Sequence, residues 1–595
     1  MGRDMKRTAI LAACLLLVSL PSSFAAELSE RLERTLHMAG SEELIYVWVY
    51  FTDKGGARLA KIRPEELVSE RSLRRRANVL PPERIVDATD LPVAEEYVRA
   101  LQPLVSELRH RSKWFNATSV AGTAAQIAQI QELPFVDRID LMARFRRTNP
   151  PEDAIPTGGV PLEKGSSTHS LDYGSSFNQV SMLRIPSVHD VGMYGQGVII
   201  GVFDNGFRLL DHEVFQSLSI LATWDFVDRK ENVAPINPSP SFGAHGIAVL
   251  SALAGYKPGT LIGPAFGATF LLARTENDSS ETPLEEDNWV AATEWADSMG
   301  VHVTSTSLGY RFYDPPYVSW SWEDMDGRTT VISQAATMAA RKGIVVLTSA
   351  GNNGTNLTQN TLNAPADADS ILAVGAVYAD GSRTAFSSVG PTTDTPPRIK
   401  PDIMAQGSQV LAASAVSTTG YQLTGGTSLA CPLAAGVAAL LVQAKPDAAP
   451  MEIIEALKST ASNASSPNNF DGWGILDAAR AINSLTGTDT ITPGDPVAST
   501  FVLNQNYPNP FNPRTRLRFE LPEAATVRIS VFDILGREVR TLVNGQRTSG
   551  IFFVDWDGRD ESGQPVSSGP YIARMEAAGL SGASSIVFRK MMLLR

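Results

Sequence analysis

Three residues of the sequence have side chains that together could carry out nucleophilic catalysis. Asp204 ends the apolar run "VIIGVFD", His245 opens the helical pattern "HGIAVLSALAG", and Ser428 stands in "GGTSLACP" ahead of another helical pattern. A serine hydroxyl becomes a good nucleophile only when an imidazole removes its proton, and a buried carboxylate must hold that imidazole in one orientation. We therefore expect Ser428 to attack, His245 to act as base and then as acid, and Asp204 to orient the ring.

Each of these residues also has a structural interpretation. Asp204 could be a turn acid, a lone histidine such as His245 is often structural, and a serine near a helix start such as Ser428 is usually an N-cap. The three are more informative together, because the order Asp, His, Ser along the chain is one of the known orders of a nucleophilic triad. The sequence thus favours catalysis over three unrelated structural roles.

The negative charge that develops during such an attack needs hydrogen-bond donors. Asn352 ends the apolar stretch "IVVLTSAGN", and its amide could donate together with the backbone N–H of Ser428. An ordinary turn asparagine is the alternative. Gly425 and Gly426 would leave room for a substrate backbone, and the start of a helix beside Ser428 would favour the negative charge.

Short apolar runs alternate with helical patterns from 170 to 486. "GVIIGVFD", "ATFLLAR", "VHVTSTSLG" and "IVVLTSAGN" read as strands, whereas "WVAATEWADSMG" and "AATMAARKG" read as helices. This alternation predicts an α/β domain with a mainly parallel sheet and helices on both faces. Such folds bind ligands at the carboxyl ends of their strands, where Asp204 and Asn352 are expected.

Two smaller units are expected on either side of this domain. Residues 26–147 combine charged helical sequence with the strand "LIYVWVYF" and a later strand, helix and strand, which predicts a small α+β unit. Residues 500–595 contain period-two strands separated by Gly, Asn and Asp turns, which predicts an all-β sandwich. Polar linkers at 148–169 and 487–499 separate the three units.

The N-terminal residues have the composition of an export signal. Residues 1–25 contain a basic start, an apolar run and small residues that suit signal peptidase. "LAAC", ending at Cys14, also fits lipid attachment, but most of the apolar run follows Cys14. Removal of this segment would leave only Cys431, which excludes an intramolecular disulfide. The net charge of −12 argues against nucleic acid as a partner. Because residues 1–25 resemble an export signal, we expect a secreted or cell-surface protein.

The motifs "VFDNGF", "HGIAVL", "SAGN" and "GTSLACP" resemble, in this order, the four signature motifs of the subtilisin-like serine proteases, the subtilases. The resemblance extends over 170–486. It implies a subtilisin-like fold that hydrolyses peptide bonds of protein or peptide substrates through an acyl-enzyme, with Asp204, His245 and Ser428 as the triad and Asn352 as the oxyanion donor. The substrate-binding residues that it implies are Ser307, Leu308, Gly309, Ala350 and Gly351.

The chain departs from the family pattern at three positions. Ile247 replaces the usual Thr after the His-Gly pair, Leu429 replaces the usual Met after the serine, and Ser305 replaces an Asn in "VTSTSLG". The first two are packing changes rather than losses of a reacting group, so we expect an active enzyme. The substrate subsite preference is the property that the departures put in doubt.

The remaining histidines and the metal chemistry have simpler expectations. His212 has a family counterpart outside the triad and is expected to be structural. No paired histidine spacing of the metalloprotease kind occurs, which argues against zinc. The chemistry requires no cofactor and no metal ligand is assigned, although the family often binds structural calcium through loop oxygens.

The flanking units carry resemblances of their own. Residues 26–147 resemble the subtilase propeptide, an inhibitor and folding template, which implies a latent precursor cut within 148–169; a permanent accessory domain is the alternative. Residues 500–595, with "NQNYPNPFNPRTRLRFEL" and the ending "KMMLLR", resemble the type nine secretion sorting domain, an immunoglobulin-like sandwich. That resemblance implies the outer-membrane secretion machinery as a partner; an ordinary carbohydrate- or protein-binding sandwich is the alternative.

Two other functions remain open at this point. One is a catalytically silent surface binding protein on the same scaffold, which an active-site serine probe would leave unlabelled. The other is a structural adhesin anchored by residues 500–595.

Overall fold

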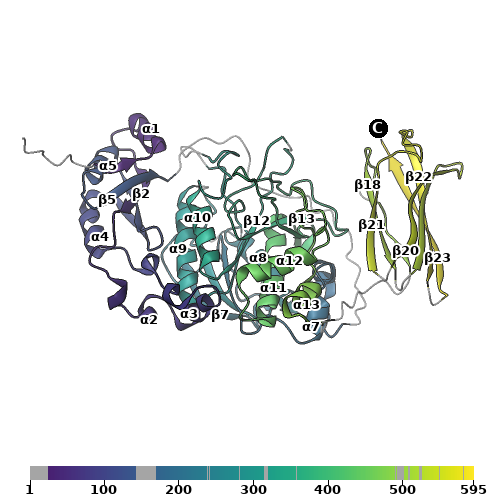
Figure 1. The fold of residues 1–595 in the computed structure, drawn as a ribbon, viewed down its shortest axis with the longest axis horizontal. Helices are drawn as coiled ribbons and strands as arrows, with labels where there is room; N and C mark the ends of the chain where they lie inside the picture. The colour runs from purple at the N-terminus through teal and green to yellow at the C-terminus, as the bar shows by residue number, and fades with distance from the viewer. Residues whose placement is uncertain are drawn as a thin grey trace, which may run out of the picture. The chain divides into compact units, whose positions relative to one another are not determined.

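The computed structural model describes residues 25–142, 169–491 and 501–594 (Figure 1), apart from short gaps at 238, 240, 280–281, 314–318, 357, 489–490, 507–508, 522–524, 548–549 and 580–581. Almost all of the predicted signal peptide and most of both predicted linkers lie outside the described residues. The chain divides into two compact units. The smaller unit comprises Met1–Gly56, Val93–Arg109 and Asn116–Leu141, and the larger unit takes the rest.

The smaller unit is a five-stranded sheet with helices, built largely from 26–147. Its strands are β1 (Glu27–Leu28), β2 (Ile45–Phe51), β3 (Glu107–Ser112), β4 (Ala117–Gly122) and β5 (Val136–Leu141), in the order β1-β5-β2-β4-β3. Its helices are α1 (Glu30–Met38), α4 (Glu95–Leu101) and α5 (Ala124–Gln131). Val47 and Val49 of β2 share a core with Ile127 and Ile130 of α5. The predicted α+β unit is therefore confirmed.

The larger unit is built around a seven-stranded sheet in the order β14-β13-β12-β11-β6-β10-β7. Every neighbouring pair of strands is parallel. The strands are β6 (Ile199–Asp204), β7 (Ser219–Asp225), β10 (Thr269–Arg274), β11 (Val303–Thr306), β12 (Val345–Ser349), β13 (Leu372–Val377) and β14 (Ile403–Gln406). Their continuous apolar runs follow from burial on both faces of a parallel sheet.

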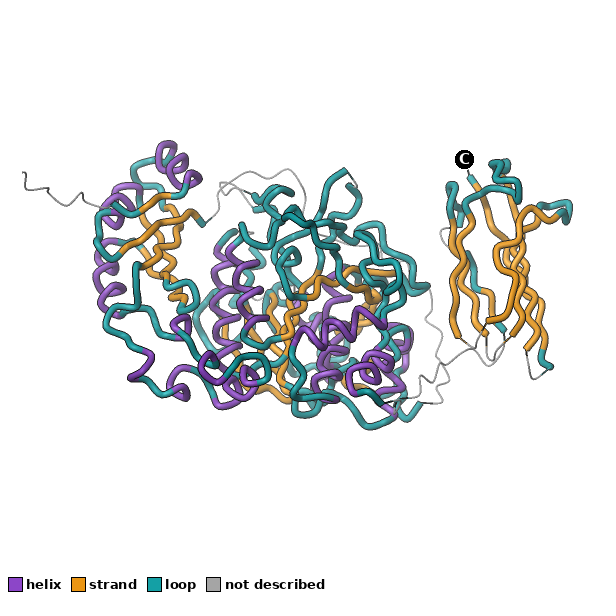
Figure 2. Tube along the Cα trace, viewed as in Figure 1, coloured by secondary structure: helices purple, strands orange, loops and turns teal. Residues whose placement is uncertain are grey.

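Helices cover both faces of this sheet (Figures 1 and 2). Ile200 and Val202 of β6 share a core with residues of α8 (Ala244–Ala254) and α11 (Thr427–Ala444). Phe203, the next residue of β6, packs edge-on against Trp289 of α9 (Leu284–Met299) on the opposite face, where α10 (Val331–Arg341) contacts α9. The predicted subtilisin-like arrangement of a parallel sheet between two helical layers is confirmed.

Helix α11 is long and apolar enough to cross a membrane by length and composition, but most of it is buried within the protein. It contacts strands β11, β12, β13 and β14 as well as helix α8. The helix is therefore a core element that supports the residues at its N-terminus.

Shorter elements complete the larger unit. The helices are α6 (Phe177–Ser181), α7 (Ile185–Asp190), α12 (Pro450–Thr460) and α13 (Ala478–Thr486), and the hairpins pair β8 (Tyr256–Lys257) with β9 (Leu261–Ile262) and β15 (Val410–Ala413) with β16 (Tyr421–Thr424).

The C-terminal region is an all-β sandwich, as predicted. One sheet has the order β17-β18-β21 and the other β20-β19-β22-β23. The strands are β17 (Val502–Leu503), β18 (Thr515–Leu521), β19 (Ala525–Phe532), β20 (Glu538–Arg547), β21 (Gly550–Trp556), β22 (Gly569–Gly579) and β23 (Ser584–Leu593). Phe519 and Trp556 of the first sheet share a core with Ile529 and Met575 of the second, so the two sheets pack face to face.

Residues 57–92 and 110–115 belong to the larger unit, although they lie within the 26–147 region that was expected to form one body. They contain α2 (Pro64–Leu67) and α3 (Glu70–Ala77). The sequence of α3, "ERSLRRRA", reads as a solvated helix, yet Arg75 and Arg76 are buried. Their carboxylate partner Asp297 lies far away in the sequence, which is why sequence periodicity could not predict this division.

Candidate active site

Asp204 and His245 are brought together by the end of a strand and the start of a helix. Asp204 is the last residue of β6, and His245 is the second residue of α8. The two side chains are joined by a hydrogen bond of 2.7 Å between His245 Nδ1 and Asp204 Oδ1. The Asp204 carboxyl is completely buried, whereas the His245 side chain is 34% exposed. The His245 ring is therefore hydrogen-bonded to a buried carboxylate and stays partly exposed to solvent.

Asn205, which directly follows Asp204, connects the same two elements. Its Oδ1 accepts the backbone N–H of Gly246 at 3.0 Å, and its Nδ2 donates to Asp278 Oδ1 at 2.5 Å. Asp278 also accepts the backbone N–H of Gly243 at 3.2 Å. The turn after β6 is thus tied to the start of α8 on both sides of His245. This role of Asn205 was not predicted from the sequence, although "DNG" after an apolar strand was a visible signal.

Ser428 is the second residue of α11, and the N-cap of that helix is Gly426, which makes no side-chain cap hydrogen bond. The backbone of Gly426 has φ +135°, a conformation that residues with a Cβ rarely adopt. Ser428 therefore does not hold the N-cap position that the structural alternative gave it.

The Ser428 hydroxyl and the Asn352 amide face the same space above Gly426. A Cβ atom added to Gly426 would lie 2.7 Å from Ser428 Oγ and 3.4 Å from Asn352 Nδ2. Asn352 Oδ1 accepts the Thr427 backbone N–H at 2.9 Å and the Thr427 hydroxyl at 3.0 Å. The amide is consequently oriented with its donor group toward Ser428. This role of Thr427 was not predicted from the sequence, although Thr427 adjoins Ser428.

The residues expected to bind substrate lie at the carboxyl ends of β11 and β12. The Ser307 hydroxyl donates to the backbone carbonyl of Ser428 at 2.7 Å, and Ser349 Oγ donates to the carbonyl of Leu308 at 3.1 Å. The Gly351 N–H donates to Thr427 Oγ1 at 3.2 Å. Gly309 lies so close to Asn363 that an added Cβ would come within 2.8 Å of the Asn363 Cβ. These contacts place the strand end beside the N-terminus of α11.

Ala350 continues β12 toward Asn352. Its N–H donates to Val374 O at 2.9 Å, and its carbonyl accepts the Asn363 N–H at 3.3 Å. This stretch of backbone is therefore held on both sides by neighbouring segments.

The departures from the family motifs lie in packed surroundings. Ile247 is fully buried in the main core, and Leu429 packs with Ala248, Ala252, Val410 and Ala412. Ser305 Oγ contacts Cys431 Sγ at 3.8 Å. Ile247 and Leu429 therefore pack in apolar cores, and Ser305 makes a contact inside the protein.

A buried acid lies close to Asp204. Glu276 follows β10, whose Arg274 is in register with Asp204. The hydroxyls of Tyr310 and Thr275 donate to its Oε1. Burial raises the pKa of Glu276 to about 8, and the charge of Asp204 adds to the rise. Glu276 is therefore mostly protonated at neutral pH and adds little negative charge near Asp204.

His212 has a structural environment, in line with the expectation for it. Its Nε2 lies 2.8 Å from the carbonyl of Gly420, and its Nδ1 accepts the Val214 N–H at 3.2 Å. This network assigns the proton to Nε2. The ring thus joins the turn after β6 to the β15–β16 hairpin.

Among the described residues, no group of three or more His, Cys, Asp or Glu side chains is arranged to hold a metal ion.

Comparisons with known proteins give each region a relative. Residues 195–474 match the model of the Subtilase family, residues 46–154 match the Peptidase S8 propeptide domain of Bacteroidota, and residues 506–581 match the FlgD Ig-like domain. The predicted resemblances to a subtilase and to its propeptide are thus confirmed at the level of these domains.

Two subtilisins match along nearly their whole length. Subtilisin DY of Bacillus licheniformis is 28% identical over 302 residues, which cover 51% of this chain and 97% of that protein. Subtilisin Savinase of Lederbergia lenta is 28% identical over 304 residues, with 51% and 97% covered. Among solved structures, a protease of Pseudoalteromonas arctica aligns with a TM-score of 0.41 and 24% identity, covering 53% of this chain and 99% of that chain.

Proposed function

We propose that this chain, whose residues 195–474 match the Subtilase family, is a subtilisin-like serine endopeptidase. Ser428, His245 and Asp204 are its catalytic triad, and Asn352 is its oxyanion donor. The observation that carries the proposal is the 2.7 Å contact between His245 and Asp204, at the same sheet edge as the Ser428 hydroxyl and the Asn352 amide. A buried carboxylate, an imidazole and a serine are the groups that acyl transfer requires.

The reaction begins with proton transfer from Ser428 to His245. Because the Nδ1 proton is donated to Asp204, Nε2 is the nitrogen that accepts the proton of the serine hydroxyl. The serine oxygen then attacks the scissile carbonyl. Asp204 holds the ring in this tautomer and stabilises the imidazolium that forms.

The tetrahedral intermediate places its negative charge near the N-terminus of α11. Asn352 Nδ2 and the backbone N–H of Ser428 donate to the oxyanion, and the helix dipole adds a favourable field. His245 returns its proton to the leaving amine, which produces the acyl-enzyme. A water activated by His245 then releases the acid product.

The expected substrate-binding backbone lies beside this centre. Residues Ser307, Leu308 and Gly309 on one side and Ala350 and Gly351 on the other would pair with an extended peptide by strand addition. The internal contacts of Ser307 and Gly351 with α11 support this role, because they fix the strand ends relative to Ser428.

Substitution of Ser428 tests the assignment. Ser428→Ala should abolish peptide hydrolysis and labelling by a fluorophosphonate probe, while the thermal unfolding midpoint stays close to that of the parent. Ser459→Ala on α12 serves as the control, because its hydroxyl makes only a local contact at 3.5 Å. Full activity of Ser428→Ala would remove the triad assignment. Absent labelling of the correctly processed parent would instead favour a silent binding protein.

We further propose that the enzyme is an exported precursor. The composition of residues 1–25 supports a signal peptide, the family match at 46–154 supports an inhibitory propeptide, and the immunoglobulin-like sandwich supports a secretion sorting role for 500–595. Deletion of 500–595 should trap the chain inside the producing cell, as measured by immunoblotting of cell and medium fractions. Normal release would contradict the sorting role.

Structural calcium stays a proposal that rests on the family alone, and no step of the reaction depends on it. Chelation with EDTA should lower the unfolding midpoint if calcium is bound through loop carbonyl oxygens, and an unchanged midpoint would remove the proposal.

A further inference from the structure

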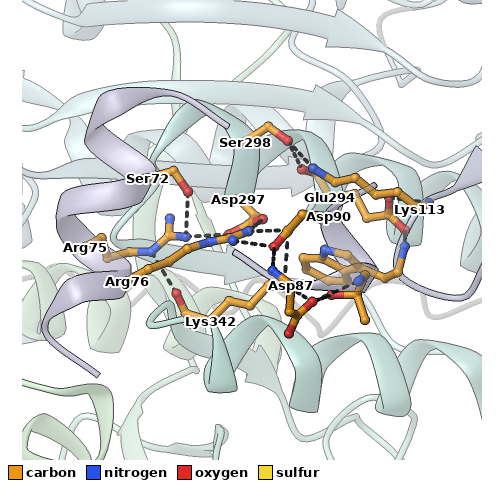
Figure 3. Close-up of polar contacts among 12 residues, drawn as sticks. Ser72, Arg75, Arg76, Asp87, Asp90, Lys113, Glu294, Asp297, Ser298 and Lys342 are labelled. Atoms are coloured by element: carbon orange, nitrogen blue, oxygen red, sulfur yellow. Dashed lines mark hydrogen bonds and ion pairs between the residues drawn. The ribbon is translucent and has the colours of Figure 1, made fainter. Parts of the chain in front are cut away.

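A cluster of buried charges lies at the amino ends of the parallel strands, whereas the proposed catalytic residues lie at the carboxyl ends. Asp297 is in the last turn of α9, Val301 precedes β11, and Lys342 follows α10 and precedes β12. These positions are at the amino ends of the parallel strands, whereas Asp204 stands at the carboxyl end of β6. Figure 3 shows the cluster, in which side chains from α3 point toward Asp297.

The peptidase side of this cluster surrounds one guanidinium group. Arg75 Nη2 donates to Asp297 Oδ1 at 2.5 Å, Nη1 donates to the carbonyl of Val301 at 2.6 Å, and Nε donates to the carbonyl of Lys342 at 3.3 Å. One carboxylate and two backbone oxygens thus match the donor directions of a planar arginine. An ammonium group carries its donors on one nitrogen and cannot reach all three acceptors in this geometry.

A second arginine completes the cluster. Arg76 Nη2 donates to Asp297 Oδ2 at 2.5 Å, and its two terminal nitrogens each donate to Asp90 at 2.8 Å. Lys342 Nζ lies 3.1 Å from the same Asp90. Positive and negative groups therefore alternate across the boundary between residues 57–92 and the peptidase domain.

The same N-terminal residues cover the end of α9, where helix carbonyls lack intrahelical partners. The Ser69 N–H donates to the carbonyl of Ser298 at 2.9 Å, and Arg71 Nε donates to the carbonyl of Met299 at 3.3 Å. Lys113 Nζ donates to Ser298 Oγ at 2.7 Å. Cationic groups at this end of the helix also complement its dipole.

Arg74, an exposed arginine of the same helix, provides an internal comparison. Arg74 pairs with Glu70 on the surface, where both side chains are more than 70% exposed. Arg75 and Arg76 are at most 3% exposed. Exposed ion pairs contribute little to stability, whereas loss of one partner from a buried pair leaves an uncompensated charge. Substitution of Arg74 should therefore have little effect on stability, whereas substitution of Arg75 or Arg76 should have a large one.

We propose that Asp297 with the carbonyls of Val301 and Lys342 forms a guanidinium-binding site, here called the α9 arginine site. This site is separate from the proposed catalytic residues and takes an arginine-bearing segment. In this chain the segment is 57–92, bound through Arg75 and Arg76. Occupancy of the α9 arginine site keeps the N-terminal region attached to the peptidase domain after the chain between them is cut. This inference rests on the proposed function only in treating such a cut as part of maturation.

The test cuts the chain after it has folded. A Ser428→Ala chain receives a recognition sequence for a site-specific protease between residues 150 and 165, and retention of the N-terminal fragment is measured by size-exclusion chromatography and by its dissociation rate from the immobilised peptidase. The variants are Arg75→Lys with Arg76→Lys, Asp297→Asn and the matched control Arg74→Lys. All are compared by circular dichroism before the cut.

The parent and Arg74→Lys should retain the fragment, whereas the double lysine variant and Asp297→Asn should release it at least 100-fold faster. Retention by the double lysine variant at the parental rate would overturn the proposal. Because the measurement uses no catalysis, its outcome is independent of the Ser428 assignment.

A second measurement avoids variants that fail to fold. The cut parent complex is titrated with arginine amide or lysine amide at equal ionic strength. Arginine amide should accelerate dissociation more than lysine amide does, because only a guanidinium matches the three acceptors. Equal effects of the two amides would contradict a guanidinium-specific site.

Discussion

Thr427 holds Asn352 through two hydrogen bonds, one from its backbone N–H and one from its hydroxyl, both to Asn352 Oδ1. The residue that precedes the proposed nucleophile thus orients the proposed oxyanion donor. Since an amide has its oxygen and nitrogen on opposite sides, anchoring Oδ1 directs Nδ2 toward the space above Gly426.

Removal of Asn352, the proposed oxyanion donor, should slow catalysis with little effect on substrate binding. Asn352→Ala is expected to lower kcat by about 100- to 1000-fold, the loss seen when the corresponding donor of subtilisin is removed. KM should change much less, because the oxyanion exists only in the transition state and intermediate. Steady-state kinetics on a chromogenic peptide gives both values. Asn356→Ala, in a turn at an exposed site, is the control, and an equal loss there would argue against a specific role.

Loss of the Thr427 hydroxyl should have a smaller effect. Thr427→Val keeps the backbone N–H donor to Asn352. It removes the side-chain donor to Asn352 and also the acceptor of the Gly351 N–H. One neutral hydrogen bond contributes about 1 kcal/mol, which corresponds to roughly a fivefold fall in kcat. Thr427→Ser restores the hydroxyl and should recover most of the activity. If serine fails to rescue the rate, the hydroxyl does not act by positioning Asn352.

Gly426 should not tolerate a side chain. In Gly426→Ala the new Cβ would lie 2.7 Å from Ser428 Oγ, on a backbone with φ +135°, so we expect both the unfolding midpoint and kcat to fall. Gly487→Ala separates the effect of the close contact with Ser428 from the effect of backbone strain. Gly487 also has a positive φ, but no atom lies within 4 Å of the added Cβ. Gly487→Ala should destabilise the fold without affecting kcat, and a comparable loss of kcat would show that backbone strain alone is responsible.

Glu276 should make stability decrease as the pH rises toward 8. Burial raises its pKa from 4.5 to about 8 in the folded chain. The contribution of Glu276 to the free energy of unfolding is fully present below pH 4.5 and is lost as the pH rises through about 8. Glu276→Gln cannot ionise, so its unfolding midpoint should change less between pH 5 and pH 8 than that of the parent. Glu455→Gln on the exposed face of α12 is the control, and parallel profiles for Glu276→Gln and the parent would contradict the assignment.

Much of the fold was predictable because buried parallel strands leave a clear pattern. The run that forms β6 is entirely apolar until Asp204, and the helices between strands carry their own periodicity. The positions of Asp204 and Asn352 at one sheet edge follow from that alternation, since carboxyl ends of parallel strands share an edge. Their catalytic roles stay predictions until they are measured.

Other features depend on contacts that local sequence does not record. Asn205 and Thr427 adjoin motif residues, but their partners become neighbours only in the fold. Arg75 and Arg76 look like solvated residues because the carboxylate that they share, Asp297, is on another element. Charge burial of this kind is decided by tertiary pairing and not by helix periodicity.

The pairing of Arg76 with Asp297 also has a consequence for the order of events in time. The two residues are 221 positions apart in the chain, and a growing polypeptide presents its N-terminal part first. During synthesis Arg75 and Arg76 of α3 stay in water until α9 and the turn at Lys342 have been made. Contacts between such distant positions close large loops and form late. The ends of α9 and α10 should therefore be among the last parts of the molecule to become protected from hydrogen exchange.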